Sequence, residues 1–532
     1  MPTGATLPNR LSPRTCSVLL LLISTLLSHA ATYDPELRWR TLQTEHFRIH
    51  FHQGEERLAD EFSLMVEDVY DTMTDEMLWE PRRRTEVVLV DRTDSANGFA
   101  GVVPYNAITI YVTHPGGDST LSLHESWPEA IFTHELTHVL HMDTNHAWVR
   151  IARGVVGRIA TTNDVSPRWM VEGLATLEET RYTSGGRGRT PQVEMIKRTS
   201  VLSDDIPPLG NLDGYQAAPP SGNLRYLYGQ DFMQFVADEQ GEDVWTRWTH
   251  IYGSGLPFLL PSKKAFGRRL VPMYQDWKEH ITERYEAQLE PVRAEGIREG
   301  RRVSDGDASC AAPAFSPDGE HLVWSCSHLD IGSRIWMSDG MGYAPEVLLV
   351  DRGASSFTWR ADSKAFVYAG LHVVSRFNTW SDVWMHTLGS DGVRSLTSAK
   401  RARDPDFSPD GSRLLVVTNE VGTNQLEQLT VDQRLTELSD FEDDTQIETP
   451  RFSPDGTHIA ASIWREGRRD LWLLDAEGNA VRRLTADAAL DVHPRWSADG
   501  RWLYFSSDRS GIPNIYAIEV ATEALYQVTN VE

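Results

Sequence analysis

Two histidines and a glutamate in the segment PEAIFTHELTHVLHMD (residues 128–143) have residue types and a spacing suited to metal chemistry. His134 and His138 are four residues apart, so on a helix they lie one above the other and can direct two ring nitrogens at one ion. Glu135 is turned by about 100° from His134 around the helix axis, so it can reach a metal-bound water without ligating the metal. This His-Glu-x-x-His pattern predicts a zinc site with Glu135 as general base. The alternative is a polar helix face that is rich in histidine.

The helix that carries these residues has a recognisable beginning. Ser126 and Glu129 are three residues apart and form a capping-box pattern, and Pro128 is tolerated in a first helical turn. The helix is therefore expected to begin before His134, so that both histidines lie inside it. A catalytic zinc ion takes three protein ligands and a water, so a third ligand must come from elsewhere.

The best candidate for the third ligand lies on a second predicted helix, PRWMVEGLATLEET (residues 167–180). Glu172 stands there among apolar residues, and a lone buried charge is costly unless it has a partner such as a metal. Pairing with an arginine is the alternative. His141 points about 60° away from the line of the first two histidines. Asp143 and His146 lie at the end of the first helix and are expected at the surface.

Together, HELTHVLH and WMVEGLA resemble the gluzincin metallopeptidases, in particular their peptidase-MA-like branch. This resemblance covers most of residues 38–285, and the two zinc motifs are its specific parts. It implies that His134, His138 and Glu172 bind one Zn²⁺ per chain, with Glu135 as the base in peptide-bond hydrolysis.

Two further stretches share the resemblance. The segment NGFAGVVPYNAITIYV (residues 97–112) resembles the edge-strand region of that family, which implies a site where an extended peptide is held by strand addition. The segment RYLYGQDFMQFVADEQG (residues 225–241) resembles a later helix of the family. Residues 184–224 are rich in glycine and proline, and a loop of that length is often a lid or a specificity element.

The chain departs from the family pattern at one position. Several gluzincins have an aspartate four residues after the third ligand, where it orients a histidine. Here that position is Thr176, with Glu178 and Glu179 beyond it, so the orienting group is not assigned. The group that stabilises the oxyanion is also left open among three candidates: Tyr226, Tyr228 and His250.

The second half of the chain repeats one phrase. AFSPDGEHLVWS, DFSPDGSRLLVV, RFSPDGTHIAAS, RWSADGRWLYFS and the degraded copy TWRADSKAFVYA place aspartates 44 to 48 residues apart. A period near 45 with short alternating strands predicts propeller blades of four strands, and Pro-Asp-Gly is turn chemistry. These repeats resemble the PD40 or TolB-like propeller family over roughly residues 300–532. That family usually has six blades and five motifs are present, so a five-bladed and a six-bladed form both remain open.

The first thirty residues predict a secretory signal peptide. Arg10 and Arg14 precede the apolar run VLLLLISTLL and the small residues that end at Ala30, where cleavage is expected. An uncleaved anchor is the alternative, although the run is short for a membrane span. Cys16 precedes the apolar run, which argues against a lipoprotein cut.

Charge and cysteine content narrow the class of protein further. The formal charge is −25, and an acidic surface of this kind repels phosphate backbones, which argues against a nucleic-acid partner. After export Cys310 and Cys326 remain, each eight residues from Asp318 at the middle of a turn. In an oxidising compartment they could form a disulfide, and two unpaired thiols are the alternative.

Taken together, the sequence predicts a multidomain protein. The domains are a signal peptide (1–30), an α+β gluzincin-type domain (31–285), a linker (286–300) and an all-β propeller (301–532). The expected function is an exported zinc metallopeptidase whose propeller controls access of a peptide or protein substrate or binds a partner protein. The alternative is an inactive periplasmic binding or assembly protein. A serine peptidase is excluded because no Gly-x-Ser-x-Gly occurs. No stable membrane span is expected after signal cleavage, and the TolB-like repeats favour the periplasm over the medium.

Overall fold

The computed structural model describes ten stretches of the chain: 33–158, 161–163, 166–214, 220–253, 265–303, 309–328, 332–350, 353–430, 433–441 and 443–532. The predicted signal peptide lies outside them. Residues 40–532 form one compact unit. Within the described stretches, no helix combines the length and the apolar character needed to cross a membrane. The predicted domain boundaries stay predictions.

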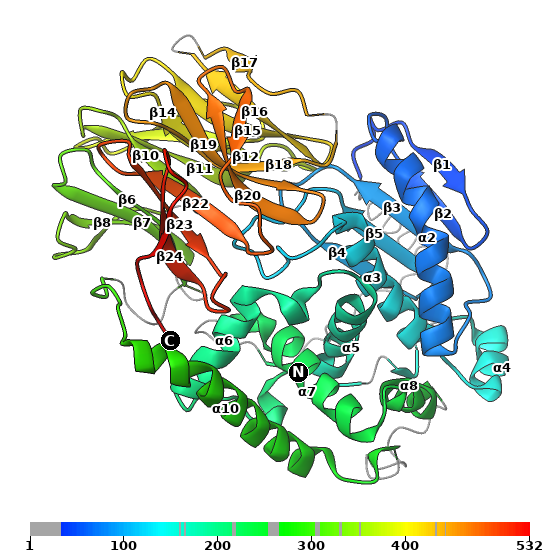
Figure 1. Ribbon diagram of the computed structural model, residues 1–532. Helices are drawn as coiled ribbons and strands as arrows, with labels where there is room; N and C mark the ends of the chain where they lie inside the picture. The colour runs from blue at the N-terminus through cyan, green and yellow to red at the C-terminus, as the bar shows by residue number, and fades with distance from the viewer. Residues whose placement is uncertain are drawn as a thin grey trace, which may run out of the picture. The chain divides into compact units, whose positions relative to one another are not determined.

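The first half of this unit is built on a five-stranded sheet in the order β1-β2-β3-β5-β4 (Figure 1). Strands β2, β3 and β5 run parallel, and the two edge strands β1 and β4 run antiparallel to their neighbours. The bounds are β1 (Arg40–Gln43), β2 (Phe47–Phe51), β3 (Thr85–Val90), β4 (Gly98–Gly101) and β5 (Ala107–Tyr111). Strands β2, β3 and β5 carry apolar side chains that alternate into the core, as the sequence pattern predicts.

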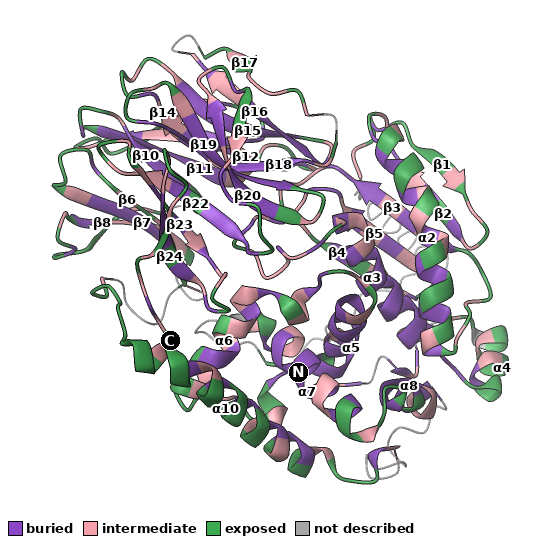
Figure 2. Ribbon diagram, in the orientation of Figure 1, coloured by how far each residue is buried: buried purple, intermediate pink, exposed green. Residues whose placement is uncertain are grey.

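Helices cover this sheet and carry the two predicted zinc-binding motifs. Figure 2 shows α3, α5 and α7 as largely buried ribbons, while α2 and α10 are exposed along one side. Gly173 of α5 faces Gly229 of α7, where a Cβ atom would lie 2.8 Å from the opposite backbone, so these two helices cross closely. The bounds are α2 (Glu56–Met77), α3 (Trp127–Asp143), α4 (Ala147–Val156), α5 (Arg168–Tyr182), α7 (Leu224–Gln240), α8 (Val244–Gly253) and α10 (Leu270–Glu295).

The expectation of one long loop over residues 184–224 is wrong. This segment contains a 12-residue helix, α6 (Pro191–Leu202), and three short 3₁₀ turns. Pro191 starts α6 at a position where proline suits a helix, and Lys197 is buried against Asp231 of α7. The turns are η2 (Arg187–Arg189), η3 (Leu209–Asn211) and η4 (Ser221–Asn223).

The described residues of the second half form five four-stranded antiparallel sheets in sequence order, which are five blades of a propeller. In each full repeat the aspartate of the turn accepts a hydrogen bond from the serine two residues before it, as Asp455 does from Ser453. The blades are β6–β9 (309–350), β10–β13 (354–395), β14–β17 (402–437), β18–β21 (446–483) and β22–β25 (491–527).

The individual strands have the following bounds: β6 (Ser309–Phe315), β7 (His321–His328), β8 (Gly332–Asp339), β9 (Glu346–Val350), β10 (Ala354–Trp359), β11 (Ala365–Val373), β12 (Thr379–Thr387), β13 (Val393–Ser395), β14 (Ala402–Phe407), β15 (Leu414–Glu420), β16 (Thr423–Leu429), β17 (Leu435–Glu437), β18 (Gln446–Phe452), β19 (His458–Arg465), β20 (Arg468–Asp475), β21 (Ala480–Arg483), β22 (Asp491–Trp496), β23 (Trp502–Ser507), β24 (Asn514–Glu519) and β25 (Leu525–Gln527).

A disulfide joins the first two strands of blade one. Cys310 of β6 pairs directly with Cys326 of β7 in the strand register, and the two sulfur atoms are bonded. The turn around Asp318 therefore brings the two cysteines together, which confirms the disulfide and excludes the alternative of two free thiols.

Buried polar contacts join the propeller to the first half. Arg401 of the propeller donates to Asp91 and Asp94, each over 2.7 Å, and all three side chains are largely buried. The indole N–H of Trp464 donates to the backbone carbonyl of His124. Since buried charges are stable only when paired, these contacts fix one half against the other.

Candidate metal centre

Three predicted ligands converge on one point. The Nε2 atoms of His134 and His138 are 3.2 Å apart. Oε2 of Glu172 lies 3.2 Å from Nε2 of His138 and 3.7 Å from Nε2 of His134. A tetrahedral zinc site with bonds of about 2.0–2.2 Å places its ligand atoms about 3.4 Å apart. The donor set therefore fits Zn²⁺ in identity and in spacing.

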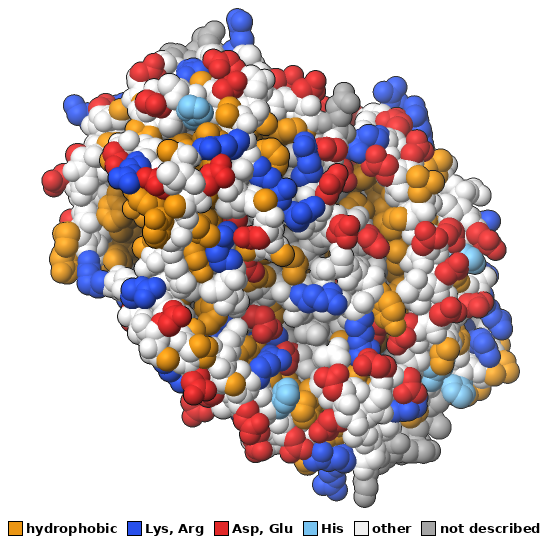
Figure 3. Space-filling model, viewed as in Figure 1, with side chains coloured by type: hydrophobic (Ala, Val, Ile, Leu, Met, Phe, Trp, Pro, Cys, Tyr) orange, Lys and Arg blue, Asp and Glu red, His pale blue; other side chains and the backbone are white. Residues whose placement is uncertain are grey.

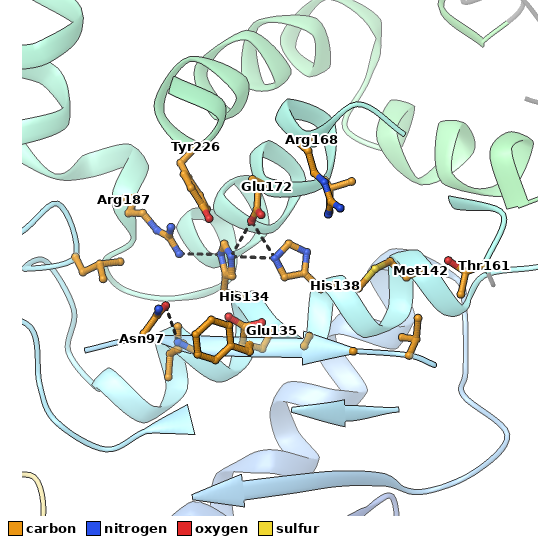
Figure 4. A pocket seen from close by; sticks show the side chains of 18 of the residues that line it. Asn97, His134, Glu135, His138, Met142, Thr161, Arg168, Glu172, Arg187 and Tyr226 are labelled. Carbon is orange, nitrogen blue, oxygen red and sulfur yellow. Dashed lines mark hydrogen bonds and ion pairs between the residues drawn. The ribbon is translucent and has the colours of Figure 1, made fainter. Parts of the chain in front are cut away.

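The helices explain why these side chains meet. Ser126 caps α3 by accepting a hydrogen bond from the backbone of Glu129, as the capping box predicts, so His134 and His138 lie on one face of a regular helix. Glu172 projects from α5, which packs on α3 (Figure 4). Among the described residues this is the only cluster of three or more potential ligand side chains that could share a metal ion.

The orienting group that the sequence left open is Glu179. Its Oε2 atom lies 2.7 Å from Nδ1 of His134, on the ring edge opposite the metal-facing nitrogen. A carboxylate at this place fixes the ring and its tautomer, with Nδ1–H as the donor. Glu179 lies two helical turns beyond Glu172, whereas the Thr176 hydroxyl donates to the backbone carbonyl of Glu172 and faces no ligand ring.

Arg187 holds Glu179 in turn. Its guanidinium donates to both carboxylate oxygens of Glu179 over 2.9 Å, and it lies 4.8 Å from the ring centre of Tyr226. Burial works to raise the pKa of Glu179, but the charges of Arg187 and His134 hold that pKa at about 2. Arg187 comes from η2 in the segment expected to be a loop, and no sequence motif marked it.

Glu135 lies beneath the edge strand β4. A Cβ atom on Gly98 would come within 2.8 Å of Oε1 of Glu135, so a glycine is required for the strand to pass this close. Burial raises the pKa of the Glu135 carboxyl, and the nearby histidines and Arg187 oppose that shift. A carboxylate with a raised pKa beside a metal-bound water has the property of a general base.

A cleft with a volume of about 490 Å³ opens onto these groups. Residues 97–103, which include β4, form one wall, and α3, α5 and Tyr226 of α7 form the others. In Figure 4, Tyr226 points toward the two histidines and Glu135 lies on the side of β4. Burial, with a further contribution from Glu172, raises the pKa of Tyr226 to about 12, so its hydroxyl remains a hydrogen-bond donor at neutral pH.

The remaining candidates lie away from this cleft. Tyr228 is fully buried and bonds to Ser200, and Nε2 of His250 bonds to the backbone carbonyl of Met77. His141 is buried and lines no part of the cleft. Two further residues also lie away from the ligands. Asp143, expected at the surface, is instead buried and pairs with Arg153 and Arg158, and His146 is the residue before the first turn of α4.

One family model matches within the second half of the chain. Residues 405–532 match the family model of the TolB beta propeller domain. The described part of the second half is a five-bladed propeller, and its residues 405–532 are similar to that domain. The Tol-Pal system protein TolB of Anaeromyxobacter dehalogenans (strain 2CP-C) is 34% identical over 118 residues, which are 22% of this chain and 27% of that protein. The same protein from Anaeromyxobacter sp. (strain K) matches to the same extent. The match thus spans about a quarter of the length of these relatives.

Among solved structures, a putative TolB from Agrobacterium tumefaciens is 20% identical, with a TM-score of 0.38, over 44% of this chain and 85% of that one. TolB from Acinetobacter baumannii is 19% identical, with a TM-score of 0.33, over 49% of this chain and 60% of that one.

Proposed function

We propose that this protein is an exported zinc-dependent metallopeptidase. The observation that supports this proposal most is the convergence of His134, His138 and Glu172 at the spacing of zinc ligands, with Glu135 beside them and a cleft open to all four. The same cleft contains a hydroxyl donor, Tyr226, so the groups required for hydrolysis of an acyl bond are present together.

The chemistry divides among these side chains. A zinc ion held there would polarise the scissile carbonyl and lower the pKa of a water. Glu135 takes the proton of that water and passes it to the leaving amine. Tyr226 donates its hydroxyl to the oxyanion of the tetrahedral intermediate. Glu179, itself held by Arg187, keeps the ring of His134 oriented.

The edge strand supplies a place for the substrate. β4 ends the sheet, so within the described residues it pairs with β5 and with no second strand, and its Gly98 N–H donates to Oδ1 of Asn97. Because residues 97–103 line the cleft, an extended peptide that pairs with this edge would pass in front of Glu135. The sheet would thereby present one peptide bond to the catalytic groups.

Three matched proteins test the proposal. Wild type, Glu135→Gln and Tyr226→Phe are compared for zinc content and for hydrolysis of internally quenched peptides. Both variants should keep stoichiometric zinc, and loss of the base or of an oxyanion donor should lower kcat by about 100-fold or more. Equal hydrolysis by wild type and Glu135→Gln would remove Glu135 as the base.

A second candidate function is a periplasmic binding or assembly protein without catalytic activity. The comparisons favour it, because the matched relatives are named as Tol-Pal system proteins and the matched family model lies within the propeller. In this case wild type would bind zinc stoichiometrically and hydrolyse no member of a broad peptide library. We propose the periplasm as the location for either function, from the predicted signal peptide and the TolB-like propeller.

A further inference from the structure

The propeller has an open side between its last blade and its first. Apolar cores join blade one to two, two to three, three to four and four to five. Among the described residues, no apolar core joins blade five back to blade one. Five blades therefore leave two sheet faces without the neighbour that every other blade face has.

Equivalent positions of the repeat show this directly. The fifth residue after the turn aspartate faces the following blade, and it is fully buried in the first four blades, at Val323, Val367, Leu415 and Ala460. In blade five the same position is Tyr504, which is 39% exposed. Blade five has no following blade to cover this position.

The first blade likewise lacks a neighbour, on the face that would pack against a preceding blade. The aromatic residue three positions before the turn aspartate reaches back to the preceding blade: the indole of Trp359 donates to a carbonyl of blade one, and that of Trp496 to a carbonyl of blade four. Phe315 holds this position in blade one and is 60% exposed. Phe315, Tyr504 and the adjacent Ile515, which is 37% exposed, define what we call the open side.

The open side continues into a hollow of about 640 Å³ along the inner strands. Its lining includes Ala311 to Pro313 of blade one and Tyr504 and Ile515 of blade five. Figure 3 shows hydrophobic side chains in a hollowed part of the surface where Figure 1 draws β6–β8 and β22–β24. The lining of the hollow also includes two oppositely charged residues, Arg403 and Glu448, whose charged groups lie 3.8 Å apart. Side chains of these types can hydrogen-bond to peptide C=O and N–H groups.

Size decides between a further blade and an extended chain. From the spacing of strands and sheets, a residue in a packed sheet occupies roughly 160 Å³, so the hollow holds about four residues and not a four-stranded blade. Asp94 and Ser95 line the hollow, and Asn97 and Gly98, only a few residues along the same segment, line the catalytic cleft. One bound chain can thus reach both spaces.

We propose that the open side is a docking site for an extended, apolar segment of the protein substrate; this inference rests on the proposed function. Aromatic and aliphatic side chains of the segment pack against Phe315, Tyr504 and Ile515, while its backbone bonds to the two charged residues of the hollow. Docking raises the local concentration of the substrate at the cleft, so it favours protein substrates over short peptides.

The experiment uses the full chain with Tyr504→Glu and Ile515→Glu substitutions. Leu64→Glu on α2 is the control, at an exposed apolar position outside the open side. Binding of fluorescein-labelled, reduced and carboxymethylated lactalbumin is measured by anisotropy in the Glu135→Gln background. The open-side variants should bind about tenfold more weakly, and the control should be unchanged. With Glu135 intact, the same variants should lose kcat/KM for the unfolded protein and keep it for short peptides.

The possible outcomes separate the two proposals. Undiminished binding by both open-side variants overturns the docking site. A dimer in sedimentation that these variants dissociate also overturns it, because the occupant is then a second copy of the chain. Binding that depends on the open side without hydrolysis of any substrate leaves the docking site standing and removes the peptidase.

Discussion

Oε2 of Glu179 lies 2.7 Å from Nδ1 of His134, and the same carboxylate is held by the guanidinium of Arg187. The chain thus places its orienting acid two helical turns after Glu172 instead of one, still on the side of α5 that faces α3. Glu179 thus forms the carboxylate–histidine pair that Thr176 cannot form. Because Arg187 holds Glu179, the segment that follows α5 is also part of the site.

Replacing this acid should weaken zinc binding. Glu179→Gln removes the charge that holds the His134 ring, and the loss of such a partner typically costs about 10- to 100-fold in metal affinity. Competition with a chromophoric chelator measures the change. Glu178→Gln is the matched control: Glu178 is buried next in the chain, burial raises its pKa to about 8, and it faces no ligand. Equal affinities for the two variants would contradict the role of Glu179.

Gly98→Ala should impair turnover without loss of metal. The added methyl group would press on Oε1 of Glu135, and displacement of a catalytic group by about 1 Å can cost about 100-fold in rate. Gly101→Ala in the same strand is the control, because a Cβ atom there meets nothing within 4 Å. Steady-state kinetics with zinc analysis compares the two. A Gly98→Ala enzyme as active as Gly101→Ala would show that the strand yields freely.

Acid should destabilise the junction between the two halves. His114 and His124 are buried against Trp464, and burial, with a contribution from Arg469, lowers the pKa of His114 to about 3 and holds that of His124 well below its usual value. Unfolded histidine titrates near 6.5, so stability is fully present above that pH and is lost as pH falls from about 6.5 toward 3. Each group contributes a slope of up to about 1.4 kcal/mol per pH unit.

Urea unfolding at a series of pH values measures this slope. His124→Leu should flatten it between pH 7 and pH 5, although its stability at pH 7 can differ from that of wild type. An unchanged slope in this variant would show that His124 is accessible to protons in the folded state.

Reducing the disulfide should destabilise the first blade. Cys310 and Cys326 are 16 residues apart in the chain. A disulfide that closes a loop of this length in the unfolded chain adds about 3 kcal/mol to the free energy of unfolding. The Cys310→Ser/Cys326→Ser protein should therefore melt at a lower temperature than the oxidised wild type. Reduced wild type should melt with the double variant. A melting temperature independent of reduction would indicate that blade one unfolds separately from the measured transition.

Local spacing predicted much of the site. The turn of a helix fixes how His134, Glu135 and His138 are arranged, and the period of the repeat fixes the blades. The structure also has helices where apolar spacing and the capping box predict them. The strand alternation around residues 85–91 likewise matches β3.

Tertiary contacts account for what the sequence did not predict. Glu179 and Arg187 act through the packing of α5 on α3 and of η2 on α5, which no local pattern encodes. The choice of Tyr226 over Tyr228 depends on which face of α7 meets the cleft. The number of blades depends on how the repeats pack around the propeller axis, and the sequence of a single repeat does not specify that number.

The pairing of Arg401 with Asp91 and Asp94 makes the first half of the chain dependent on the propeller. Removing the propeller would remove Arg401, the cation that pairs with Asp91 and Asp94, and would expose both carboxylates to solvent. The remaining half would also lose the contact of Trp464 with His114 and His124, so it is expected to be less stable than in the intact chain. The two halves therefore depend on each other for stability, and the role of each is best tested by point substitutions in the intact chain.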